Sequence, residues 1–268
     1  MDVVARHNIT VSGPENGRPL VFAHGFGCDQ HMWRHVAPAF EDTHRVVRFD
    51  FVGAGGSTVP YDPDRYATLD GYAADVLEVI RGLGLRDAVF VGHSVSAMIG
   101  ALAQVEAPDL FDRLVMVGPS PRYIDDDAYV GGFDEPAIHG LLDALRSNYL
   151  GWSATMAPLI VGNADRPALG EELTESFCRM DPAAAEGFAR ATFLSDHRDV
   201  LSRISAPTLV IQCRDDLIAP VSVGEYVAAT VPDAELVVLD ATGHCPNLSA
   251  PGETIDAIAT FLRLRSAA

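Results

Sequence analysis

Short hydrophobic runs recur along the chain, and each is followed by a glycine-rich or polar turn and then by hydrophobic residues at helical spacing. The runs are centred on residues 20–23, 45–49, 89–91, 113–117, 207–212 and 235–239. Strands that are hydrophobic on both faces are buried on both faces, so the runs predict a mostly parallel sheet with helices on either side. The looser alternation from Val3 to Val11 predicts one or two edge strands. The expected fold class is therefore α/β, with a mostly parallel sheet of eight strands.

Helices are expected between these strands, because hydrophobic residues recur there at three- and four-residue intervals. Asp29 is a candidate N-cap for the first helix, and Thr68 or Asp70 begins the second. Later helices are expected over residues 94–105, 221–230 and 251–263.

The alternation of strands and helices stops between residues 121 and 200. No strand pattern is evident there, whereas Ile138 and Leu142 share one helical face and Leu173 and Phe177 suggest a second. A helical segment inserted into an α/β sheet is typical of a cap. The expected organisation is an α/β core made of residues 1–120 and 200–268 and a helical cap, or lid, made of residues 121–199.

The charge and the cysteines restrict the partners and the compartment. A net charge of −18 over 268 residues disfavours nucleic acid and anionic membranes as partners. No hydrophobic run approaches the ~18 residues of a membrane span, and the N-terminus lacks a secretory-signal pattern. The cysteines are scattered, without metal-type spacing or a disulfide framework: Cys28, Cys178, Cys213 and Cys245. We therefore expect reduced thiols and a cytoplasmic location.

The run at 89–91 leads into Gly92-His93-Ser94-Val95-Ser96, which matches the G-x-S-x-G nucleophile elbow except that Ser96 replaces the second glycine. In such an elbow a sharp strand-to-helix turn exposes the serine hydroxyl to a base. The motif alone is common by chance, and the alternative interpretation is a plain turn in which Ser94 caps a helix. The elbow therefore requires a base and a carboxylate elsewhere in the chain.

Candidate partners for Ser94 follow the last two predicted strands, in the order Ser, Asp, His that this topology requires. Asp215 and Asp216 compete for the role of the carboxylate. Asp216 is favoured because it stands four residues before Pro220, the usual placement in this fold. His244 is the candidate base, and its structural alternative is a capping histidine.

Backbone N–H groups after the nucleophile and after an early strand form the oxyanion hole in this arrangement. Val95 supplies the first N–H group. The segment His24-Gly25-Phe26-Gly27 places Phe26 for the second, because its glycines allow close approach of the backbone to a ligand. His24 is interpreted as a structural hydrogen-bonding residue.

Other patterns do not predict a metal or cofactor site. The Gly53–Ser57 loop lacks the lysine of a P-loop. His31 and His35 are four residues apart but lack the H-E-x-x-H pattern of a zinc site. We therefore expect no metal and no cofactor.

Together these features resemble the α/β-hydrolase superfamily and, within it, the RsbQ branch, the bacterial relatives of the plant strigolactone and karrikin receptors. The resemblance extends over residues 92–100, 115–123, 129–133, 148–152, 176–178, 193–198, 218–220 and 243–246, and serine at position 96 matches this branch. It implies a four-helix, V-shaped cap over a deep apolar pocket with Ser94, Asp216 and His244 at its floor. The implied pocket wall, for which core packing is the alternative, comprises Phe26, Tyr123, Phe133, Trp152, Met156, Phe193 and Ile218.

Two functions share these residues. The first is a serine hydrolase acting on a small hydrophobic ester or lactone, with an RsbQ-like role in sigma-factor regulation and stress signalling. The second is a positive regulator that binds a small hydrophobic ligand with little turnover. This regulator engages a signalling protein, such as a PAS-containing sensor phosphatase. Dehalogenase and epoxide-hydrolase functions are disfavoured, because both need an acid where Ser94 stands.

Overall fold

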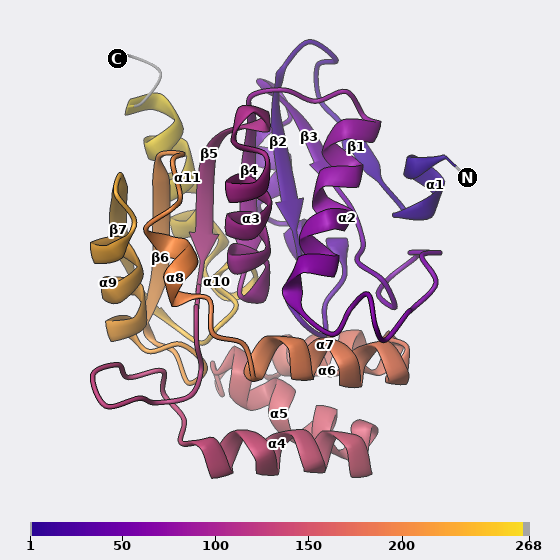
Figure 1. Ribbon diagram of the computed structural model, residues 1–268, viewed down its shortest axis with the longest axis vertical. Coiled ribbons are helices and arrows are strands. Elements are labelled where there is room, and N and C mark those ends of the chain that lie inside the picture. The colour runs from indigo at the N-terminus through magenta and orange to yellow at the C-terminus, as the bar shows by residue number, and fades with distance from the viewer. Residues whose placement is uncertain (1, 265–268) are drawn as a thin grey trace.

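The structure is a computed structural model that describes residues 2–264. Its strands form one sheet in the order β1-β3-β2-β4-β5-β6-β7. The strands are β1 (Thr10–Ser12), β2 (Arg18–Ala23), β3 (His44–Arg48), β4 (Ala88–His93), β5 (Phe111–Val117), β6 (Thr208–Asp215) and β7 (Ala234–Thr242). Among the strands of the described residues, only β1 runs antiparallel to its neighbour, and the others point the same way (Figure 1). The predicted mostly parallel α/β sheet is confirmed.

Within residues 2–264 the sheet has seven strands, so the expected number of eight is wrong. The difference lies at the N-terminus, where Val3–Arg6 form the short helix α1. The side chain of Asp2 caps this helix by accepting the Val4 N–H group. Asn8 then takes a positive φ of 47°, which turns the chain and leaves a single short strand, β1, to pair with β3.

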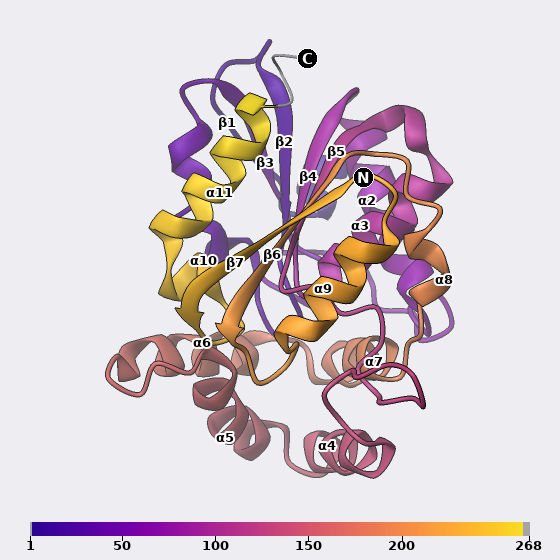
Figure 2. The same ribbon diagram turned by 90° about the vertical axis from the view of Figure 1, so that its left-hand side faces the viewer.

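Helices cover both faces of the sheet (Figure 2). One face carries α2 (Leu69–Gly82), α3 (Val95–Glu106), α8 (Arg198–Leu201) and α9 (Val221–Thr230). The other carries η1 (Gln30–Trp33), η2 (Ala37–Phe40), α10 (Pro246–Ser249) and α11 (Pro251–Leu264), while η3 (Pro108–Leu110) leads into β5. The single helix expected after Asp29 is thus two short 3-10 helices. None of the described helices is long and apolar enough to cross a membrane.

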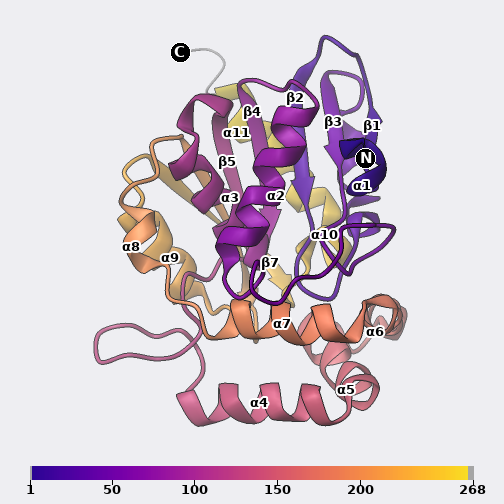
Figure 3. The same ribbon diagram turned by 45° about the vertical axis from the view of Figure 1, so that its right-hand side comes forward.

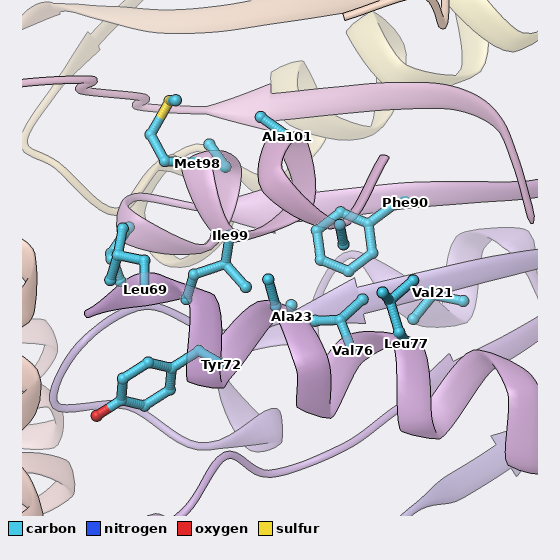
Figure 4. Packing of buried hydrophobic residues seen from close by; sticks show 14 of the residues in the cluster. Val21, Ala23, Leu69, Tyr72, Val76, Leu77, Phe90, Met98, Ile99 and Ala101 are labelled. Atoms are coloured by element: carbon cyan, nitrogen blue, oxygen red, sulfur yellow. The ribbon is translucent and has the colours of Figure 1, made fainter. Parts of the chain in front are cut away.

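The hydrophobic core fixes α2 and α3 against the centre of the sheet (Figure 4). Val76 and Leu77 of α2 lie beside Val21 of β2 and Phe90 of β4. Gly100 allows α3 to pack on the ring of Phe90, because a Cβ atom there would lie 2.3 Å from Phe90 Cε1. This close packing holds the turn between β4 and α3 in place.

Between β5 and β6 in the chain, four helices precede the short helix α8, as the resemblance implies, and we call these four the helical layer. They are α4 (Glu135–Ser147), α5 (Tyr149–Val161), α6 (Pro167–Arg179) and α7 (Pro182–Phe193). The layer lies beyond the carboxyl ends of the strands, with α7 between the sheet and α4 (Figure 3). Phe188 of α7 stacks on Tyr72 of α2, with ring centroids 4.2 Å apart, so the layer shares the hydrophobic core.

Candidate active site

Ser94 alone makes the turn between β4 and α3. Its φ of 56° and ψ of −125° are unfavourable for an L residue, and such strain is typical of functional positions. Gly92 makes the turn possible, because a Cβ atom there would lie 2.4 Å from the carbonyl oxygen of Ser96. The Ser94 N–H group donates to the Val117 carbonyl oxygen at 2.7 Å. The turn places the Ser94 side chain in a cavity beneath the helical layer.

Ser96, where the motif has a glycine, ties α3 to the segment 24–27. Its hydroxyl group donates a hydrogen bond to the carbonyl oxygen of His24. The His24 ring in turn accepts the N–H group of Phe51 at 3.1 Å, and its other nitrogen lies 2.9 Å from the Gly25 carbonyl oxygen. His24 thus holds loops together and is not hydrogen-bonded to Ser94.

His244 links Ser94 to Asp216. His244 Nε2 lies 2.7 Å from Ser94 Oγ, and His244 Nδ1 lies 2.7 Å from Asp216 Oδ2. The side chains of His244 and Asp216 are 4% and 1% exposed. Asp215, the competing candidate, is the last residue of β6 and is exposed. The structure therefore brings together Ser94, His244 and Asp216 and leaves Asp215 outside.

Backbone and side-chain donors surround the Asp216 carboxylate. Its Oδ1 accepts the N–H groups of Ile218 and Ala219 at 2.8 and 3.1 Å, and Gln212 Nε2 donates to Oδ2 at 3.1 Å. Burial raises the pKa of Asp216, but His244 and the backbone N–H groups of Ile218 and Ala219 outweigh this effect and hold the pKa below its ordinary value. Asp216 is thereby kept ionised beside His244.

His93 supports the backbone of His244. The ring of His93 is buried, and its Nε2 lies 2.7 Å from the carbonyl oxygen of His244. Burial, followed by repulsion from His244, lowers the pKa of His93 from 6.5 to about 3. The folded protein therefore holds His93 neutral where the unfolded chain would protonate it.

This difference predicts acid sensitivity. Between pH 6.5 and about 3 the unfolded state binds one more proton at His93, so the free energy of unfolding falls as pH falls. One such proton contributes about 1.4 kcal/mol per pH unit. Urea unfolding of His93→Asn between about pH 7 and 5 is expected to show a shallower pH dependence than the wild type.

A matched control is His139→Asn, which replaces an exposed histidine on α4 that faces Glu135 at 3.7 Å. It is expected to keep the wild-type slope. Equal slopes for wild type and His93→Asn would contradict the assignment of a buried, neutral His93.

The predicted oxyanion donors flank Ser94. Val95 is the first residue of α3, and the first N–H groups of a helix have no partner within the helix. Phe26 follows β2 in the segment 24–27 and lines the same cavity as Ser94 and His244. The residues predicted to supply the two N–H donors therefore lie on two separate elements next to Ser94.

The cavity beside Ser94 has a volume of about 30 Å³. Four of the seven predicted wall residues line it, namely Phe26, Tyr123, Phe193 and Ile218. Phe133, Trp152 and Met156 do not line it, although all three pack in the same hydrophobic cluster. Trp152 instead contacts the rings of Phe26 and Phe177, at centroid distances of 6.1 and 5.4 Å.

Several wall residues were not predicted from the sequence. They are Cys28, His93, Ile160, Leu173, Phe177, Thr192 and Cys245. Leu173 and Phe177 share one helical face, but periodicity does not show which cavity a helical face covers. Burial raises the pKa of the Cys28 and Cys245 thiols, so both are held protonated. The Tyr123 hydroxyl is also buried in this wall.

Within residues 2–264, His7, Asp75 and Glu78 have the composition of a metal site, with potential ligand atoms within 4.8 Å of one another. Cationic side chains already neutralise both carboxylates. Asp75 accepts hydrogen bonds from Arg65 and Tyr66, and Glu78 pairs with Arg6 at 3.4 Å. The group thus behaves as an ion-pair network between α1 and α2, apart from Ser94.

The site combines a strained serine between a strand and a helix with a histidine, His244, that links it to a buried aspartate. All three lie at the carboxyl ends of parallel strands, and this arrangement defines the alpha/beta hydrolase class. The model of the alpha/beta hydrolase family matches residues 20–257. The chain belongs to this family and is an enzyme of the ester-hydrolase type, so the predicted superfamily is confirmed.

Three proteins illustrate the relationship. The chain is 42% identical to strigolactone esterase D14 of Arabidopsis thaliana, covering 96% of this chain and 94% of that protein. It is 40% identical to the karrikin insensitive 2 receptor CA of Petunia hybrida, covering 93% of both. A hydrolase from Oleispira antarctica superposes with a TM-score of 0.95 at 38% identity, covering 98% of this chain and 96% of that one.

Proposed function

We propose that the protein hydrolyses small, mostly hydrophobic esters or lactones, with Ser94 as nucleophile, His244 as general base and acid, and Asp216 as the orienting carboxylate. The observation that carries this proposal is the pair of 2.7 Å contacts that His244 makes with Ser94 and Asp216. The small, largely apolar cavity around Ser94 favours a hydrophobic acyl compound.

The hydrogen-bond partners assign the proton on His244. An ionised carboxylate only accepts, so Nδ1 carries the proton that Asp216 binds, and Nε2 is left as an acceptor. Nε2 can then take the hydroxyl proton of Ser94 as Oγ attacks the carbonyl carbon. The resulting imidazolium lies next to Asp216, which stabilises its charge.

The tetrahedral intermediate has an anionic oxygen, which the N–H groups of Val95 and Phe26 would bind. Collapse of the intermediate breaks the ester bond, and His244 gives its proton to the leaving alcohol. Water, deprotonated by His244, then attacks the acyl-Ser94 ester and releases the acid. In a lactone the alcohol and the acid are one molecule, so only ring opening is observed.

We also propose that residues 121–199 act as a cap over a core of residues 1–120 and 200–268, and that the protein works in the cytoplasm. The first point is supported by the position of the helical layer beyond the carboxyl ends of the strands and by the cavity that Ser94 shares with Leu173, Phe177 and Phe193 of that layer. The second is supported by four cysteines that are all free, three of them buried.

The test is a progress curve with p-nitrophenyl acetate and with a small lactone. Many equivalents of product per protein are expected, with loss of activity after a phosphonate ester labels Ser94. Hydrolysis that continues after complete labelling of Ser94 would contradict the proposal.

A second candidate is the regulator that binds its ligand with little turnover, in an RsbQ-like signalling pathway. It is favoured by the 40% identity to a protein named as a receptor. In the same assay it would release about one equivalent of product in a burst and then nearly stop. Its partner would be a PAS-containing phosphatase. If such a phosphatase from the same source did not bind the immobilised chain, the proposed signalling partner would be excluded.

A further inference from the structure

The cavity beside Ser94 is far smaller than an ordinary ligand site. Its volume of about 30 Å³ compares with roughly 300–1,000 Å³ for small-molecule pockets and leaves space on the order of a few waters. An acyl group attached to Ser94 must nevertheless fit there, together with the water that releases it. The side chains that fill the space around the cavity therefore limit the size of the acyl group.

Phe177 of α6 occupies the space above the predicted oxyanion segment. Its ring is 1% exposed and packs edge-on against Phe26 and Trp152, at centroid distances of 5.3 and 5.4 Å. The ring also lies directly on the backbone of Gly27, where a Cβ atom would come within 1.9 Å of Phe177 Cε1. Gly27 has a φ of +75°, so its backbone and its missing side chain both suit this contact.

Ion pairs hold α6, and with it the ring of Phe177, against the core. Arg34 pairs with Glu172 at 2.5 Å, and Arg179 pairs with Asp29 at 3.3 Å. The carbonyl oxygen of Phe177 also accepts the Tyr149 hydroxyl at 2.8 Å. Phe177 is therefore fixed by ion pairs in the middle and at the C-terminal end of α6 and by a hydrogen bond from α5, and its ring is a wall of the site.

We infer that Phe177 is a specificity-determining residue that restricts the enzyme to esters with short acyl chains, on the order of acetyl to butanoyl. This inference rests on the proposed function, because it concerns the acyl group carried by Ser94. Removal of the phenyl ring leaves space that is continuous with the cavity, because Phe177 lines it beside Phe26 and Leu173. A longer chain can then extend over Gly27 toward Trp152.

The test compares kcat/KM for p-nitrophenyl acetate, butanoate and octanoate. Wild type is expected to prefer acetate, and Phe177→Ala is expected to raise the octanoate-to-acetate ratio by about 10-fold or more, since single methylene groups change such ratios roughly 10- to 200-fold. Phe177→Leu, a milder change that retains the hydrophobic contact with Gly27, is expected to give a smaller shift and serves if the alanine variant does not fold.

Phe40→Ala is the matched control, because Phe40 is a buried phenylalanine that does not line the cavity. It is expected to lower stability and to leave the ratio unchanged. An unchanged ratio in both Phe177 variants, or equal use of octanoate and acetate by the wild type, overturns the inference while Ser94-dependent hydrolysis stands. Failure of the wild type to cleave any ester through Ser94 would instead overturn the proposed function.

Discussion

Replacement of Ser94 by alanine is expected to lower kcat/KM for p-nitrophenyl acetate by about 10⁴-fold or more, with little change in stability. The reason is that the variant removes the only atom that forms the acyl bond, so His244 and the N–H donors have no nucleophile to assist. A 10⁴-fold loss corresponds to about 5.5 kcal/mol of transition-state stabilisation. The fold loses the hydrogen bond between Ser94 and His244, which is worth about 1 kcal/mol.

The measurement is an initial-rate assay, with thermal unfolding of the same samples. Ser153→Ala is a suitable control, because Ser153 is also a buried serine but donates its hydroxyl hydrogen bond to Tyr149 within α5. It is expected to keep wild-type activity. Activity in Ser94→Ala equal to that of Ser153→Ala would exclude Ser94 as the nucleophile.

The sequence predicts the central strands well because their burial on both faces leaves a strong hydrophobic signal. It predicts the N-terminal edge poorly, since the alternation from Val3 to Val11 fits a strand as well as a short helix followed by a strand. The Asp2 cap and the positive φ of Asn8 favour the short helix, and neither feature leaves a signal in the pattern of hydrophobic residues. The number of strands therefore depends on local backbone chemistry.

The same limit applies to the site. The order of Ser94, Asp216 and His244 can be predicted because each follows a predicted strand, and parallel strands end at one edge of the sheet. Two other contacts of the site join residues that are far apart in the sequence. The hydrogen bond from Ser96 to His24 spans 72 positions (96 − 24), and the contact of Phe177 with Gly27 spans 150 (177 − 27). The first contact arises from the packing of α3 against the segment after β2, and the second from the packing of the helical layer on the core. Periodicity specifies neither.

Replacement of Asp216 by asparagine is expected to lower kcat/KM by about 10³- to 10⁴-fold, the order of loss that follows when a histidine base is held in the wrong tautomer. The N–H groups of Ile218 and Ala219 need an acceptor, so the oxygen of the introduced amide would face them and its NH₂ group would face His244. Nδ1 of His244 must then accept, which places the ring proton on Nε2. That proton points at Ser94 and blocks removal of its hydroxyl proton.

Asp215→Asn separates this effect from a general loss of negative charge. The Asp215 side chain is exposed, and its carbonyl oxygen, which the substitution leaves unchanged, accepts the Gly243 N–H group at 2.7 Å. Wild-type kcat/KM is expected for this variant in the same initial-rate assay. A larger loss in Asp215→Asn than in Asp216→Asn would mean that the neighbouring carboxylate orients His244 during catalysis. Wild-type activity in both variants would mean that His244 needs no carboxylate, and the proposed relay would then end at His244.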